Sequence, residues 1–144
     1  MSNPQQEQEA IKNFFMAISK LKQLGIIRSD KYLGDIGEYI CVQLYNMQLS
    51  KSQRQEGYDG LIGDKRCQVK FHNSPKRTNI YVGDPSKYDL LIVVLGPNSK
   101  LRPDNKNDFL IYKFTPKYIS KNCKRKKGYY CAKKDLKKIN DRYS

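Results

Sequence analysis

Residues 57–71 have the sequence GYDGLIGDKRCQVKF, and this stretch decides the fold that the sequence predicts. Gly63-Asp64 is a recognised two-residue turn between two runs of strand-forming residues, so an antiparallel hairpin is expected. This turn places Asp59 opposite Gln68. Because side chains alternate along a strand, Lys70 points to the same face as Gln68. The other face is apolar and belongs to the core.

The sequence after this hairpin predicts further strands. Residues 79–82 form a short strand, and residues 90–95 (LLIVVL) are continuously apolar, which is typical of a central strand covered on both faces. Residues 109–114 form the last clear strand. Thr115-Pro116 opens a helical turn, and a final helix is expected to carry three apolar residues on one face: Ala132, Leu136 and Ile139.

Two helices are expected before the hairpin. The first is capped by Ser2 or Asn3, has Pro4 in its first turn and ends near Leu24. Its apolar residues recur at three- and four-residue steps and share one face: Ile11, Phe14, Phe15, Ile18 and Leu21. The second helix runs from Ser29 or Asp30 to about Met47. Gly34 and Gly37 lie inside it, which indicates close approach of its backbone to the sheet or, less expectedly, to nucleic acid.

The predicted fold class is α/β, of the α+β kind, with a central mixed sheet flanked by helices. A length of 144 residues suits a single domain, 1–144, with a basic C-terminal segment at 117–144. The chain carries 28 Lys and Arg against 14 Asp and Glu, a net charge of +14. Such a field attracts polyanions, so nucleic acid is the first candidate partner. An anionic membrane surface comes second, because the chain has no Trp for an amphipathic anchor.

The four cysteines show neither zinc-finger nor redox spacing, so neither a zinc site nor a redox motif is expected. Cys41 and Cys67 lie in apolar stretches and are expected in the core. No signal peptide and no apolar run long enough to cross a bilayer are evident, which predicts a cytoplasmic protein, associated with the nucleoid when it is bound to DNA.

The polar face of the hairpin suits phosphodiester hydrolysis. That reaction needs a cation to neutralise the anionic phosphate and to acidify a water molecule. Mg²⁺ prefers oxygen ligands, usually from one or two carboxylates. Asp59 and the Gln68 amide oxygen would supply two ligands, and Glu38 from the preceding helix would add a second carboxylate. Lys70 would contact the attacking water or the phosphate. Mn²⁺ is a possible substitute for Mg²⁺.

The order of Glu38 on a helix, Asp59 on a strand and Gln68-Val69-Lys70 on the next strand resembles the PD-(D/E)XK nuclease superfamily, over roughly residues 30–95. Restriction endonucleases, some homing endonucleases and Holliday-junction resolvases belong to it. The resemblance implies a restriction-endonuclease-like core, with metal at Asp59 and Gln68, assistance from Glu38, and Lys70 serving the nucleophilic water. Two positions depart from the motif: Tyr58 stands in place of Pro, and Gln68 replaces an acidic residue.

The function expected is a Mg²⁺-dependent endonuclease acting on double-stranded DNA, of restriction or homing type, and a homodimer or higher homo-oligomer. A junction resolvase and a non-catalytic DNA- or RNA-binding module on the same fold are the alternatives. A solvated outer face of the hairpin is the structural alternative for the same residues, and His72 has a weaker claim to the site. Residues 117–144 hold eleven Lys or Arg and two Asp, interleaved with tyrosines. The expected DNA contacts are Lys51, Arg54, Lys76, Arg77, Lys121, Lys124, Arg125, Lys126 and Lys127.

Overall fold

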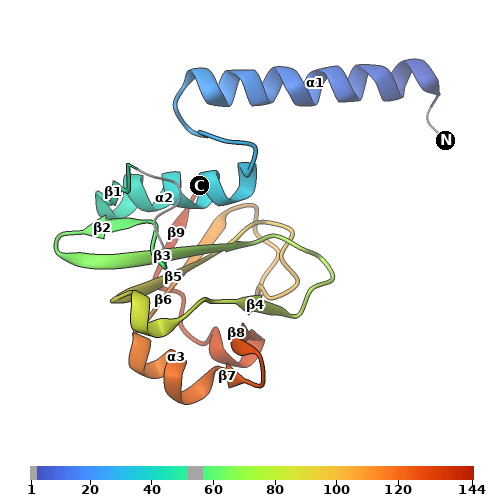
Figure 1. Ribbon diagram of the computed structural model, residues 1–144. Helices are drawn as coiled ribbons and strands as arrows, with labels where there is room; N and C mark the ends of the chain where they lie inside the picture. The colour runs from blue at the N-terminus through green and yellow to red at the C-terminus, as the bar shows by residue number, and fades with distance from the viewer. Residues whose placement is uncertain (1–2, 52–56) are drawn as a thin grey trace.

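The computed structural model describes residues 3–51 and 57–144, and it has a mixed α/β architecture (Figure 1). A six-stranded mixed sheet, in the order β1-β2-β3-β5-β6-β9, carries helix α2 along one side. A smaller sheet, in the order β4-β8-β7, lies with α3 at the opposite side of the large sheet. The mixed α/β class expected from the sequence is confirmed.

The predicted hairpin is present with the predicted register. Strands β2 (Gly60–Ile62) and β3 (Lys65–His72) pair antiparallel, with Gly60 opposite Cys67 and Ile62 opposite Lys65. Gly63 has φ +61, a left-handed conformation that glycine adopts at low cost in a tight turn. On the outer side of β2, the two-residue strand β1 (Gln48–Leu49) pairs antiparallel with it, and the sequence did not predict this strand.

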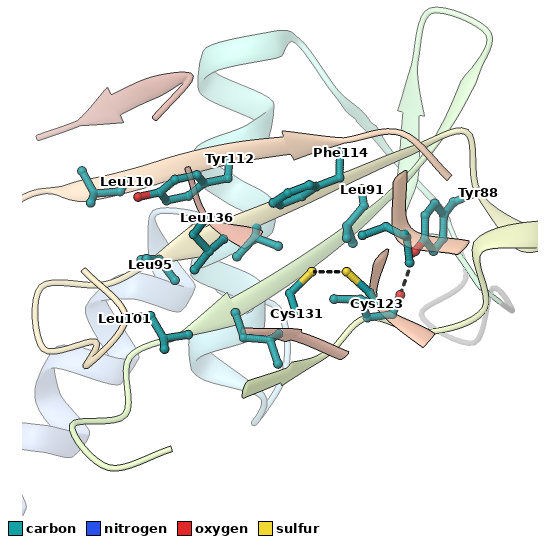
Figure 2. Close-up of a cluster of buried hydrophobic side chains, with 14 residues drawn as sticks. Tyr88, Leu91, Leu95, Leu101, Leu110, Tyr112, Phe114, Cys123, Cys131 and Leu136 are labelled. Atoms are coloured by element: carbon teal, nitrogen blue, oxygen red, sulfur yellow. Dashed lines mark hydrogen bonds between the residues drawn. The ribbon is translucent and has the colours of Figure 1, made fainter. Parts of the chain in front are cut away.

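Strand β5 (Leu90–Leu95) is the centre of the molecule. It pairs parallel with β3 and antiparallel with β6 (Phe109–Phe114). Leu91, Val93 and Leu95 face one core cluster, shown in Figure 2, whereas Ile92 and Val94 face the cluster beneath α2. The prediction that this continuously apolar strand is covered on both faces is confirmed.

Helix α2 (Tyr32–Tyr45) packs against β3 at Gly37. A Cβ atom at Gly37 would lie 3.1 Å from the Phe71 ring, so the glycine permits close approach of helix to sheet, as expected. The helix is shorter than predicted. It begins at Tyr32 and not at Ser29 or Asp30, because the residues before it are held in a loop by the Asp35 carboxylate.

Helix α1 (Pro4–Gln23) has the predicted bounds and starts with a capping box between Asn3 and Gln6. Figure 1 shows that it stands away from both sheets and joins the rest of the chain through the loop before α2. Its predicted apolar face is divided. Ile18 is buried, but three large apolar side chains are exposed: Ile11, Phe14 and Phe15.

The predicted final helix is wrong. After α3 (Pro116–Asn122) the chain forms β7 (Lys124–Arg125), β8 (Gly128–Ala132), the short 3-10 helix η2 (Lys133–Asp135) and β9 (Asp141–Tyr143). Strand β8 pairs with β4 (Asn79–Tyr81), and β9 pairs with β6. Both partners lie far away in the sequence, so their backbone hydrogen bonds override the local helical spacing of the apolar residues.

Strand β9 is held to the molecule by an ion-pair network. Arg142 donates to Asp104 at 2.7 Å and to Asp108 at 2.9 Å, and the buried Arg102 contacts the same two carboxylates. The guanidinium groups lower the pKa of both aspartates.

None of the described helices is long and apolar enough to span a bilayer.

Candidate active site

The candidate site begins with the loop before α2, which is fixed by the buried Asp35. Oδ2 of Asp35 accepts hydrogen bonds from the backbone N–H groups of Arg28 and Ser29, both at 2.7 Å, and from the Ser29 hydroxyl at 2.9 Å. Backbone donors that lie outside a helix need such partners when they are shielded from water. The carboxylate therefore sets the path of residues 28 and 29 along the first turns of α2.

This loop places Arg28 beside Glu38. The guanidinium donates to Oε1 of Glu38 at 3.1 Å, and the Glu38 side chain is only 17% exposed. Burial raises the pKa of the Glu38 carboxyl from 4.5 to about 7, and the negative charge of Asp59 adds to this shift while Arg28 opposes it. Among the described residues, the positive charge of Arg28 therefore does not fully offset the cost of ionising the buried Glu38 carboxyl.

Asp59 lies immediately before β2 and is anchored to β3. Its N–H donates to the Cys67 carbonyl at 2.7 Å, and its Oδ2 accepts the Val69 N–H at 2.7 Å. Burial raises the pKa of the Asp59 carboxyl, whereas the Val69 hydrogen bond and the positive charge of Lys70 lower it. The Val69 N–H thus fixes the direction of the carboxylate at the open end of the hairpin.

Gln68 and Lys70 lie on the same face of β3, as predicted. With the amide orientation that satisfies both of its ends, the Gln68 nitrogen donates to the Gly57 carbonyl at 3.0 Å and its oxygen accepts from Nζ of Lys70 at 3.2 Å. Burial lowers the pKa of the Lys70 ammonium, and the nearby Asp59 carboxylate raises it. Nζ of Lys70 also lies 5.4 Å from the centre of the Tyr81 ring on β4, within cation–π range.

A pocket of about 180 Å³ joins the helix and hairpin parts of the site. Glu38 and Asp59 line it together with Tyr58, Arg28 and the backbone of Gly34. A Cβ atom at Gly34 would meet nothing within 4 Å, so this glycine faces open space and not the sheet. The two carboxylates that the sequence selected thus share one cavity.

The predicted DNA-contacting residues divide into two groups around this site. Lys76 and Arg77 are exposed after β3, and Lys51 is exposed beyond β1, whereas Arg54 lies outside the described residues. The remaining residues are exposed on α3 and on the β7–β8 hairpin: Lys121, Lys124, Arg125, Lys126 and Lys127. Figure 1 shows α3, β7 and β8 on the side of the sheet away from α2.

Two tyrosines connect the site with this basic hairpin. The Tyr81 ring, which lies beneath Lys70, contacts the Tyr130 ring on β8 with centroids 5.4 Å apart. Tyr81 is 52% exposed. The two rings therefore form a partly open aromatic surface between the Lys70 ammonium and the β7–β8 hairpin.

His72 does not belong to the site. It is fully buried, with Nδ1 2.7 Å from the Ser99 hydroxyl and Nε2 3.1 Å from the Arg77 carbonyl. Both ring nitrogens are thus engaged in holding the loops that follow β3 and β5. These contacts support a structural role for His72 and not a catalytic one.

A separate buried cluster combines Cys123, Cys131 and Asp135, with potential ligand atoms all within 4.8 Å of one another. The two sulfur atoms are 3.6 Å apart and are joined by a dashed line in Figure 2, and burial raises the pKa of both thiols. Asp135 accepts hydrogen bonds from Tyr118 and from the Ala132 N–H. The sequence spacing gave no sign of this cluster, which offers one ligand fewer than a structural zinc site requires.

Sequence reasoning missed Arg28, Asp35 and Tyr81. The acidic residue in the first turn of α2 is a recognisable signal for Asp35, since carboxylates near helix N-termini accept backbone N–H groups. Arg28 and Tyr81 reach the site only through tertiary contacts, and no local pattern marks them.

Comparison of the sequence with protein-family models and with curated proteins found no match.

Proposed function

We propose that this chain is a Mg²⁺-dependent DNA endonuclease of the PD-(D/E)XK type, with Glu38, Asp59, Gln68 and Lys70 as its site. The observation that carries the proposal is the convergence of a helix carboxylate and a hairpin carboxylate on one pocket, with Lys70 near enough to Asp59 for its positive charge to lower the pKa of that carboxyl. The mixed sheet that carries α2 along one side supports it as well. The net charge of +14 favours a polyanionic substrate.

The oxygen donors of this site fit Mg²⁺. Asp59 and Glu38 offer the hard carboxylate oxygens that this ion accepts, and the raised pKa values of both carboxyls indicate ionised forms in need of positive charge. The Gln68 amide oxygen would be a third ligand only by sharing its contact with Nζ of Lys70. The bound ion would neutralise the phosphate and acidify a water molecule. Arg28 would have to share Glu38 with it, since the guanidinium contacts Oε1 at 3.1 Å.

The protein's own groups supply the rest of the chemistry. Nζ of Lys70 donates to the attacking water or to a phosphate oxygen, and the Gln68 oxygen at 3.2 Å orients the ammonium. Val69 N–H holds Asp59 in place for ligand binding. Lys76 and Arg77 contact the DNA backbone on one side, and the Lys126-Lys127 turn contacts it on the other.

A non-catalytic nucleic-acid-binding module is the second candidate, and Gln68 is the observation that favours it. The amide lacks the charge of a carboxylate, and its two ends already bond Gly57 and Lys70. A junction resolvase would use the same chemistry on branched DNA. Cleavage and binding experiments separate these three functions.

The test is to incubate the protein with supercoiled DNA, linear double-stranded DNA and a four-way junction, in Mg²⁺ or in EDTA. Asp59→Asn and Lys70→Ala are expected to abolish cleavage. Asp64→Asn and Lys65→Ala, which change the same residue types at exposed positions of the same hairpin, should cleave like the unaltered protein. Circular dichroism of each variant verifies that it is folded.

Mg²⁺-dependent cleavage that is lost only in the Asp59 and Lys70 variants is the result the proposal requires. Cleavage that continues in EDTA or in Asp59→Asn contradicts it. Preference for the junction over linear DNA identifies a resolvase. If no substrate is cut while DNA binding is retained, the chain is a binding module.

A further inference from the structure

Helix α1 presents an uncovered apolar stripe to solvent. Ile11 is 59% exposed, Phe15 is 57% exposed and Met16 is 69% exposed, and they follow one another along one side of the helix. The opposite edge is anchored to its own chain, because Ile18 is buried and the Phe14 ring contacts Tyr32 with centroids 5.9 Å apart. Figure 1 shows that no other helix or strand of the described chain covers α1.

A helix in this position needs a partner. In proteins most helical stability comes from the packing of an apolar face and not from intrinsic helix propensity. Aromatic side chains bury about 150–250 Å² when fully covered, and Phe15 still has 57% of its surface exposed, so covering it with a partner is favourable. Large apolar side chains gathered on one face mark an interaction surface.

The charges on α1 show which partner fits. Glu9 and Lys20 are both exposed, near opposite ends of the helix. They are eleven residues apart, close to three full turns, so they lie along the same edge. The midpoint between them falls next to Phe15. The helix is thus acidic before the apolar stripe and basic after it, which is a self-complementary pattern in the antiparallel orientation.

We propose that α1 is the interface between two copies of this chain, packed antiparallel about a two-fold axis near Phe15. This axis brings Glu9 of each copy beside Lys20 of the other, so one ion pair forms at each end. Phe15 of the two copies then pack together at the centre, flanked by Ile11 and Met16. A parallel arrangement would place like charges together and is disfavoured.

The size of the apolar surface fits a weak dimer that forms at high concentration. The exposed parts of the apolar side chains on α1 amount to roughly 400 Å² per copy, about half of the ~800 Å² that each partner contributes to a stable interface. Neighbouring polar side chains of the same face, Lys12 and Ser19, supply the rim. A lipid surface fits less well, because interfacial helices concentrate Lys and Arg on the polar face, and α1 also carries Glu7 and Glu9.

The first test is sedimentation equilibrium of the full chain, with and without the Phe15→Glu substitution. The unaltered chain is expected to dimerise, and Phe15→Glu to be monomeric with an unchanged circular dichroism spectrum, because Phe15 is not a core residue. An unaltered chain that is monomeric at high concentration overturns the proposal. So does a dimer that Phe15→Glu leaves intact.

Charge reversal tests the orientation. Glu9→Lys and Lys20→Glu should each weaken the dimer roughly tenfold, since each reversal replaces two ion pairs per dimer by two repulsions. The double variant restores opposite charges and should recover the affinity of the unaltered chain. Lys117→Glu, an exposed reversal on α3, is the control and should have no effect. Failure of the double variant to recover excludes the antiparallel pair.

Anionic phospholipid vesicles test the competing occupant. If the chain is monomeric and binds vesicles through Phe15, a lipid surface covers α1 and the dimer is refuted. None of these measurements depends on nuclease activity, so the interface and the proposed function are tested separately.

Discussion

Replacement of Asp35 by alanine tests the construction of the candidate site most directly. Asp35 is 6% exposed, and one of its carboxylate oxygens accepts three hydrogen bonds from Arg28 and Ser29. Hydrogen bonds to charged groups contribute about 1.5–3 kcal/mol each, but three on one oxygen are not additive and the released loop regains water. The expected loss in the free energy of unfolding is therefore about 3 kcal/mol.

The measurement is urea unfolding at neutral pH, read as a shift of the midpoint at constant slope. Asp30→Ala is the matched control. Asp30 belongs to the same loop, but its side chain is 90% exposed and its ion pair with Lys22 spans 3.6 Å. We expect that control to change stability by less than about 0.5 kcal/mol. Equal effects of the two substitutions, or a loss below about 1 kcal/mol for Asp35→Ala, would refute the role assigned to this carboxylate.

Four further substitutions test individual contacts. Glu38→Gln, measured in EDTA, should be as stable as the unaltered protein near pH 4.5 and more stable by at most about 3 kcal/mol above pH 7. The reason is that the pKa of the Glu38 carboxyl is raised to about 7, so its ionisation costs folding free energy. A difference in stability that does not change with pH contradicts this prediction. Gly34→Ala should raise the free energy of unfolding by about 0.5–1 kcal/mol in chemical denaturation. Gly37→Ala should raise the free energy of unfolding by less, because its Cβ would meet Phe71 at 3.1 Å. Arg102→Met should lower the midpoint of thermal unfolding, because Asp104 and Asp108 each lose a guanidinium partner and keep only Arg142, and a neutral result would show that Arg142 suffices.

The sequence predicted the elements whose pairing is local or whose environment is uniform. The two-residue turn at Gly63 fixes the register of the hairpin, and a one-residue slip would have turned Cys67 and Val69 away from the core. The continuous apolar run of β5 needed no partner to be recognised as central. These elements position Asp59, Gln68 and Lys70, so the hairpin half of the candidate site was accessible from residue patterns.

The rest depends on contacts between segments far apart in the sequence. Strand β8 forms because Ile80 and Tyr81 pair with it, and β9 forms beside β6, so local spacing at Leu136 and Ile139 was misleading. Arg28 enters the site because a carboxylate seven residues later holds its backbone. The exposure of Phe15 could not be read from periodicity, since an amphipathic pattern predicts a covered face and does not say whether the same chain covers it.

The charges of the chain distinguish a structural network from a candidate active site. In the network around Arg102 and Arg142, the guanidinium groups lower the pKa of Asp104 and Asp108, so ionisation of these carboxyls stabilises the fold. At the candidate site the signs are reversed, because burial raises the pKa of Glu38 and lowers that of Lys70. Ionisable residues whose burial costs folding free energy cluster at sites where a ligand or a reaction needs their charge. The opposite pKa shifts of these two carboxyl clusters are therefore a physical argument for function at Glu38 and Asp59 that is independent of any sequence motif.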